Sequence, residues 1–103
     1  MTKIIYSSKS KQTLKEAAIY IAEESSSIEL ALKTVSKMRS KLKKRLEAFP
    51  YSGQFVTTVN GIEFFKIIIG RYTFVYKIVE SEDEEIVVVT NVIHEKRGNF
   101  GIE

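Results

Sequence analysis

His94 is the only histidine of the chain, and the chain contains no cysteine. An imidazole has an ordinary pKa of about 6.5, so His94 is a candidate for proton transfer at neutral pH. The sequence identifies no carboxylate partner for it, and a structural histidine that hydrogen-bonds locally is the favoured interpretation. A metal site built from histidine and cysteine is excluded, and we expect neither a metal nor an organic cofactor.

A run of basic residues is the second candidate site. Residues 1–48 contain eleven basic and five acidic residues, whereas residues 49–103 contain five and eight. The basic residues are densest between positions 33 and 45, where no acidic residue occurs: Lys33, Lys37, Arg39, Lys41, Lys43, Lys44 and Arg45. Such a run attracts phosphate groups or an acidic partner, although it also fits the solvated face of an ordinary helix.

Aromatic residues alternate at Tyr72, Phe74 and Tyr76. Aromatic rings on the surface of a sheet can stack on nucleic-acid bases. Packing of the same face beneath helices or a partner protein is the favoured alternative. The acidic segment 80–85 is expected to be a solvated hairpin tip without chemistry of its own.

The basic residues are expected to lie on helices. A short β-prone segment at 3–6 is followed by apolar residues at helical spacing between positions 14 and 21. Ser26 with Glu29 fits a capping box, which starts a second helix. In that helix apolar residues recur every three or four positions, and most basic residues fall between them.

The remainder of the chain is β-prone. The segments 54–59, 62–69, 72–79 and 86–93 are rich in β-branched and aromatic residues, and Asn60-Gly61 is typical of a tight hairpin. We expect an α+β fold of order β-α-α-β-β-β, with a helical hairpin packed on one face of a mainly antiparallel sheet. The 103 residues suffice for one domain, here 1–103. Neither a membrane span nor a signal peptide is recognisable, so we expect a cytoplasmic protein without a membrane partner.

The order of these features resembles the RelE/ParE superfamily of toxins from bacterial type II toxin–antitoxin systems. The resemblance is carried by Ile5-Tyr6-Ser7, Leu14-Lys15-Glu16, Tyr20-Ile21, Leu46, Phe49-Pro50, Gly53, Gly70-Arg71-Tyr72, Phe74-Val75-Tyr76, Val92-Ile93-His94 and Arg97. It implies a growth-inhibiting toxin of the plasmid-stabilisation type, which a cognate antitoxin neutralises.

The resemblance is closer to the ParE-like branch, whose members inhibit DNA gyrase by binding it. In the RelE-like branch, which cleaves mRNA on the ribosome, Lys66 matches a catalytic lysine, and Arg71, His94 and Arg97 would complete the site. However, Thr73 and Phe64 stand where that branch carries an arginine and a lysine.

The ParE-like interpretation assigns target binding to Lys96, Arg97 and Phe100, near the C-terminus. Two alternatives stay open beside it. One is a ribosome-dependent mRNA endoribonuclease, whose partners would be the ribosome and mRNA. The other is a degenerate, non-toxic member of the superfamily that retains only the ability to bind its antitoxin.

Overall fold

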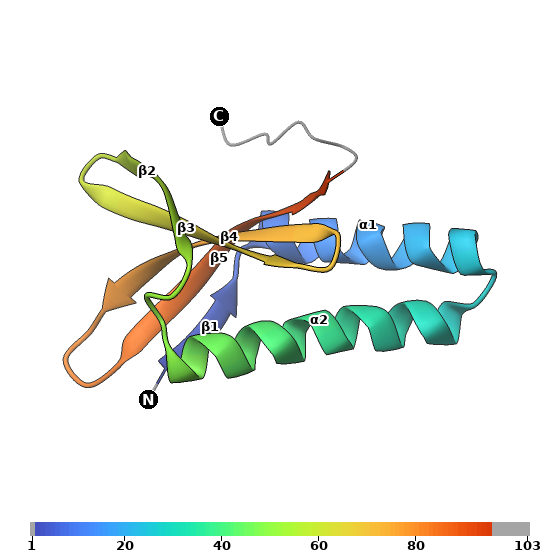
Figure 1. Ribbon diagram of the computed structural model, residues 1–103, viewed down its shortest axis with the longest axis horizontal. Coiled ribbons are helices and arrows are strands. Elements are labelled where there is room, and N and C mark those ends of the chain that lie inside the picture. The colour runs from blue at the N-terminus through green and yellow to red at the C-terminus, as the bar shows by residue number, and fades with distance from the viewer. Residues whose placement is uncertain (1, 96–103) are drawn as a thin grey trace.

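Residues 2–95 form two helices and five strands in the computed structural model, which describes this part of the chain (Figure 1). The elements are β1 (Thr2–Tyr6), α1 (Ser8–Ser25), α2 (Ile28–Ala48), β2 (Gln54–Val59), β3 (Ile62–Ile69), β4 (Tyr72–Glu80) and β5 (Glu85–His94). The expected α+β class, with a helical hairpin on a sheet, is confirmed. Four strands follow the hairpin, one more than in the expected order β-α-α-β-β-β, although the sequence marks all four segments as β-prone.

The strands form one sheet in the order β1-β5-β4-β3-β2. Strand β1 runs parallel to β5, and the other three pairs are antiparallel, so the sheet is mainly antiparallel as expected. The first and the last of these strands are therefore direct neighbours. Strands β1 and β2 form the two edges of the described sheet.

The core lies between the helices and one face of the sheet. Tyr72, Phe74 and Tyr76 of β4 are buried there, in the same cluster as Leu42 and Leu46 of α2. The prediction that these aromatic rings pack beneath the helices is thus confirmed, and they are not exposed for stacking on bases. Side chains between them along the strands lie on the opposite face of the sheet, because successive residues of a strand alternate.

The helical hairpin turns at two consecutive serines. Ser26 adopts a left-handed conformation, with φ 57°, and ends α1. Ser27 caps α2, because its side-chain oxygen accepts a hydrogen bond of 3.1 Å from the backbone N–H of Leu30. The predicted capping residue, Ser26, was therefore wrong by one position: a residue that ends one helix in this conformation cannot also cap the next.

A tight turn joins α2 to β2, and the Tyr76 hydroxyl holds it. This hydroxyl accepts a hydrogen bond of 3.0 Å from the N–H of Gly53 and donates one of 3.1 Å to the carbonyl of Pro50. A Cβ atom at position 53 would collide with the hydroxyl and the ring of Tyr76. Glycine is therefore required at position 53 by this close approach, which explains the spacing between Pro50 and Gly53 in the sequence.

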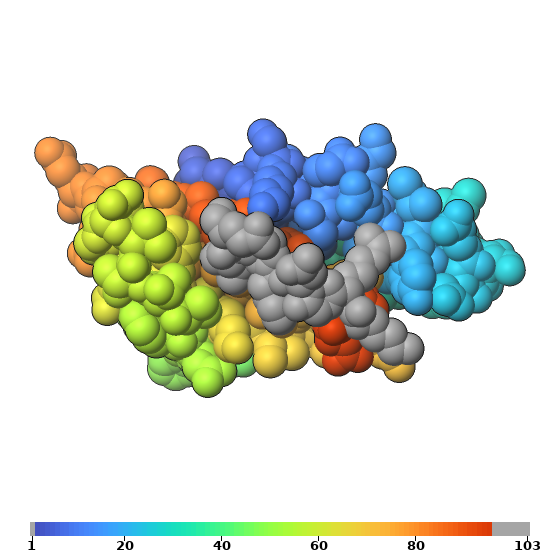
Figure 2. Space-filling model, turned by 90° about the horizontal axis from the view of Figure 1, so that it is seen from above, coloured from blue at the N-terminus to red at the C-terminus, as the bar shows by residue number. Residues whose placement is uncertain are grey.

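The helical hairpin extends past the sheet, and the α1–α2 turn, in cyan, forms one end of the molecule (Figures 1 and 2). Apolar side chains near this end are exposed, notably Ile28 at 73% and Leu32 at 61%. Within residues 2–95, neither helix is long and apolar enough to cross a membrane.

Candidate functional site

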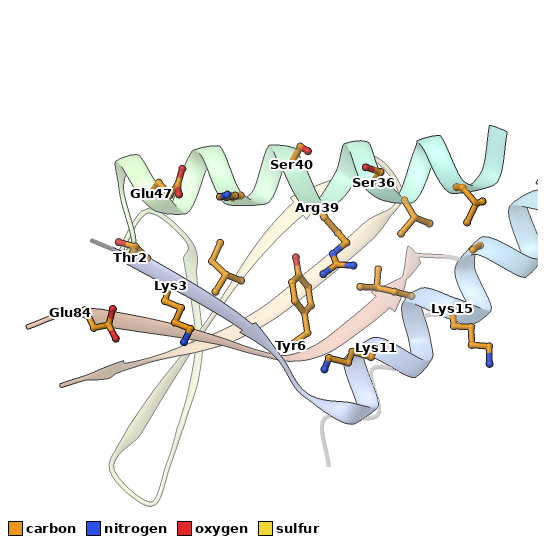
Figure 3. A pocket seen from close by; sticks show the side chains of 16 residues that line it. Thr2, Lys3, Tyr6, Lys11, Lys15, Ser36, Arg39, Ser40, Glu47 and Glu84 are labelled. Carbon is orange, nitrogen blue, oxygen red and sulfur yellow. The ribbon is translucent and has the colours of Figure 1, made fainter. Parts of the chain in front are cut away.

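A groove with a volume of about 940 Å³ lies between β1 and the α1–α2 hairpin (Figure 3). Its apolar wall is formed by side chains of all three elements, and we call it the β1 groove. The apolar residues are Ile4, Leu14, Ala18, Leu32 and Val35. Because β1 pairs only with β5 among the described strands, the groove runs beside a free strand edge.

Two serines fix the wall of this groove to the sheet. The Ser10 hydroxyl, which is fully buried, donates a hydrogen bond of 2.9 Å to the carbonyl of Val89 in β5. The Ser7 hydroxyl accepts a hydrogen bond of 3.0 Å from the N–H of Ser10, so it caps α1 directly after β1. The position of α1 against the strand edge is thus set by polar contacts as well as by packing.

Charged residues are distributed unevenly around the β1 groove. Lys11 and Lys15 of α1 and Arg39 of α2 gather toward one end, whereas Glu47 and Glu84 lie at the other (Figure 3). Lys3 and Lys43 also line the groove. The groove therefore combines an apolar wall with a surplus of positive charge, which suits an amphipathic acidic segment.

Tyr6 and Arg39 point toward one another across the groove (Figure 3). The guanidinium carbon lies 4.6 Å from the centre of the Tyr6 ring, which is a cation–π contact. Burial raises the pKa of Tyr6 above 10.0, and the nearby positive charge of Arg39 acts in the opposite direction. The phenol therefore stays neutral at physiological pH and can donate a hydrogen bond.

A second pocket, with a volume of about 610 Å³, lies beside the β3–β4 turn, and we call it the turn pocket. Apolar and aromatic side chains form part of its lining: Tyr20, Ile21, Met38, Ile69 and Tyr72. Its basic residues are Lys37, Lys41 and Arg71, with His94 also in the lining. Both helices contribute to this pocket as well, but through residues other than those that line the β1 groove.

The basic run of α2 divides between these two pockets. Arg39 and Lys43 line the β1 groove, whereas Lys37 and Lys41 line the turn pocket. An α-helix has about 3.6 residues per turn, so residues four apart share a flank while residues two apart do not. Lys33 lies outside both pockets, with its amine 4.0 Å from a carboxylate oxygen of Glu29.

The two remaining members of the run lie near the end of α2. Lys44 is exposed and lines neither pocket. Arg45 is also exposed, and its Nε donates a hydrogen bond of 3.4 Å to the hydroxyl of Ser52. The seven basic residues are thus not one continuous stripe, although all of them are exposed.

The residues proposed for a nuclease site are only partly brought together. His94 lies on the helix-facing side, where its ring centre is 4.9 Å from that of Tyr72 and 5.7 Å from that of Tyr20. Arg71 lies in the β3–β4 turn, with its Nε 3.8 Å from a carboxylate oxygen of Glu95. Lys66 pairs with Val75 on the other face of the sheet. Lys96, Arg97 and Phe100 lie outside the described residues.

A β-bulge decides on which face His94 lies. Val87 and Val89 face the helices, and strict alternation from them would place position 94 on the opposite face, with Lys66. The register between β4 and β5 shifts at Thr90, because Tyr76 pairs with Val89 and Val75 pairs with Asn91. The extra residue reverses the alternation.

Sequence reasoning missed the basic residues outside the run that line the β1 groove. Lys11 and Lys15 are four positions apart on α1, a spacing that places them on one flank of a helix. Tyr6 was assigned only to a strand, with no contact predicted. Among the described residues, no group of three histidine, aspartate or glutamate side chains is arranged to hold a metal ion.

Comparison with known proteins gives one family match. A family model described as the ParE toxin of the type II toxin–antitoxin system parDE matches residues 4–98. No curated protein matches the chain. The match begins within β1 and extends past the end of β5, so it includes both helices, the turn pocket and most of the residues that line the β1 groove.

Proposed function

The chain belongs to the ParE toxin family of type II toxin–antitoxin systems, and from this premise we propose that it inhibits growth by binding DNA gyrase. An antitoxin partner follows from the family. The finer statements, namely the identity of the target and the surface that the antitoxin covers, are our proposals.

The separation of Lys66 from His94 supports a binding toxin rather than a nuclease. Cleavage of RNA at a phosphodiester needs a base, a cation and an acid within hydrogen-bond reach of the same few atoms. Lys66 and His94 lie on opposite faces of the sheet. In addition, Thr73 and Phe64 supply no charge near Lys66, because neither side chain is ionisable.

The β1 groove is the surface that we propose for the antitoxin. A free strand edge can pair with an extended segment, and an apolar groove between helices can take an amphipathic helix. Lys11, Lys15 and Arg39 favour acidic residues on that segment. Exposed apolar residues such as Leu32 continue the groove toward the α1–α2 turn.

The decisive experiment measures the two activities side by side. The protein is induced in cells and mRNA ends are mapped; in parallel, purified protein is added to gyrase and DNA supercoiling is measured. We expect inhibited supercoiling and no mRNA ends positioned at ribosomal A-site codons. Lys66→Ala is expected to leave growth inhibition unchanged, because Lys66 stands apart from the other candidate catalytic groups.

The opposite pattern would overturn the proposal. If the protein is a nuclease, Lys66→Ala should remove charge stabilisation worth about 2–4 kcal/mol, so that cleavage falls about 10²–10³-fold together with toxicity. Lys77→Ala is a matched control, because it removes the same charge from the neighbouring strand β4. Neither activity in the unmutated protein would indicate a member that only binds its antitoxin.

A further inference from the structure

We propose that the turn pocket is the surface that engages the target of this toxin, and that its occupant is an acidic protein segment carrying an apolar anchor side chain. The proposal rests on the toxin function argued above and adds to it a place on the molecule and a chemistry for the partner.

The lining of the turn pocket fits an apolar anchor. Met38 of α2 and Tyr72 of β4 are both buried at 7% exposure, and they are joined in the lining by Ile21 of α1 and Ile69 of β3. Apolar side chains from four elements thus converge on a volume of about 610 Å³. Pockets of this size hold a drug-sized group, so one or two large apolar side chains can enter.

The charges around this pocket call for an acidic partner. Lys37 and Lys41 are one turn apart on α2, and Arg71 approaches from the β3–β4 turn. Of the described residues that line the pocket, Glu24 is the only one with a carboxylate. Exposed cations around an apolar pocket steer an acidic segment toward it and disfavour a basic one.

A protein segment fits this pocket better than a nucleic-acid strand. The carboxylates of Glu24 and of Glu95, which pairs with Arg71, repel phosphates and carboxylates alike, so they do not distinguish the two occupants. A nucleic-acid strand, however, needs cations that follow its backbone over several nucleotides. The basic residues of α2 divide between two flanks instead, so they do not form such a track.

The turn pocket and the β1 groove are separate surfaces, so the target and the antitoxin would bind at different places on the toxin. The turn pocket and the β1 groove are lined by different residues of α2, so one helix presents cations to two partners. The turn pocket also includes the end of β5, because His94 is part of its lining. Mutations in the two pockets should therefore affect toxicity and neutralisation independently.

The test compares two double variants of α2 with the same change in charge. Lys37→Glu with Lys41→Glu reverses the charge of the turn pocket. Lys33→Glu with Lys44→Glu makes the same change at exposed positions outside both pockets. Growth inhibition on induction, inhibition of purified gyrase and co-purification with the cognate antitoxin are measured for both, and thermal unfolding verifies that both fold.

We expect the turn-pocket variant to need at least about tenfold more protein for half-inhibition, because it sets like charges against an acidic segment. The control variant should stay within about twofold of the unmutated toxin, and both variants should retain the antitoxin. Binding of the toxin to gyrase is also measured without DNA, and we expect the turn-pocket variant alone to lose it.

Three results would overturn the proposal: equal toxicity of the two variants, loss of the antitoxin from the turn-pocket variant, or a loss of binding seen only with DNA. If the unmutated protein stops growth without inhibiting gyrase, the proposal that gyrase is the target is wrong. Comparison of growth inhibition by the two variants then still tests whether the turn pocket binds the target. A protein without any toxicity would overturn both proposals.

Discussion

The hydroxyl of Tyr76 connects the sheet to the segment that follows α2. It pairs with the N–H of Gly53 and the carbonyl of Pro50, both in the connection between α2 and β2. Its ring is fully buried, in the cluster formed with the helices. One side chain of the sheet therefore sets where α2 ends and where β2 begins.

Tyr76→Phe should lower the free energy of unfolding by about 1–3 kcal/mol, because two partly buried backbone groups lose their partner. The ring remains, so the fold should be retained. Denaturant unfolding of the two proteins measures the difference. Tyr51→Phe provides a control, because the Tyr51 hydroxyl pairs with Glu80 at an exposed position and its loss should change little.

The same pair of proteins gives a test by pH. Burial raises the pKa of Tyr76 above its ordinary value of 10.0, so the folded protein keeps the proton when the unfolded chain has lost it. This contribution to stability is present below pH 10 and is lost as the pH rises through the folded pKa. The stability difference between the unmutated protein and Tyr76→Phe should therefore shrink above about pH 10. A difference that stays constant there would contradict the assignment.

At the scale of the elements, the hairpin between α1 and α2 depends on two adjacent serines with opposite requirements. Ser27 stabilises the hairpin through its side chain, which caps α2. Ser26 is in the left-handed region, where a Cβ atom is unfavourable.

Mutations at these two positions should therefore change the free energy of unfolding in opposite directions. Ser27→Ala should lower the free energy of unfolding by about 1 kcal/mol through loss of the cap. Ser26→Gly should raise it by about 0.5–1 kcal/mol, since glycine adopts this conformation without strain. Thermal unfolding of both variants checks the pair. A loss of stability in both would contradict the assignment of the two caps.

Much of this fold can be predicted from local patterns. Apolar spacing locates α1 and α2, and β-branched segments and Asn60-Gly61 locate the strands, because these features depend on neighbours in the sequence. The parallel pairing of β1 with β5 cannot be found in this way, since it joins segments about eighty residues apart.

The site is less predictable than the fold for the same reason. The alternation of residues along β5 gives the wrong face for His94 unless the bulge at Thr90 is known. Likewise, the seven basic residues form one run in the sequence. Only the packing of α2 against β1 and the β3–β4 turn shows that Arg39 and Lys37 serve different pockets.

For the molecule as a whole, the uneven distribution of charge should control how fast the antitoxin arrives. Association with the antitoxin should slow as ionic strength rises from about 0.01 M to about 0.15 M, because salt screens the attraction between a basic groove and an acidic segment. Stopped-flow mixing measures this rate.

Paired variants show which cations are responsible. Arg39→Ala with Lys43→Ala should reduce the dependence on salt, whereas Lys37→Ala with Lys41→Ala should reduce it less, because these lysines lie on the other flank of α2. A rate that does not change with salt would rule out electrostatic steering.

The pairing of β1 with β5 has a consequence for how the protein folds while it is synthesised on the ribosome. Strand β5 lies between β1 and β4, yet it is synthesised after every other described strand. Until residues 85–94 leave the ribosome, β1 has no strand to pair with and the Val89 carbonyl that holds Ser10 is missing. The nascent chain therefore cannot complete the β1 groove. Since pairing of distant segments is also slow, the groove forms only after residues 85–94 have been made.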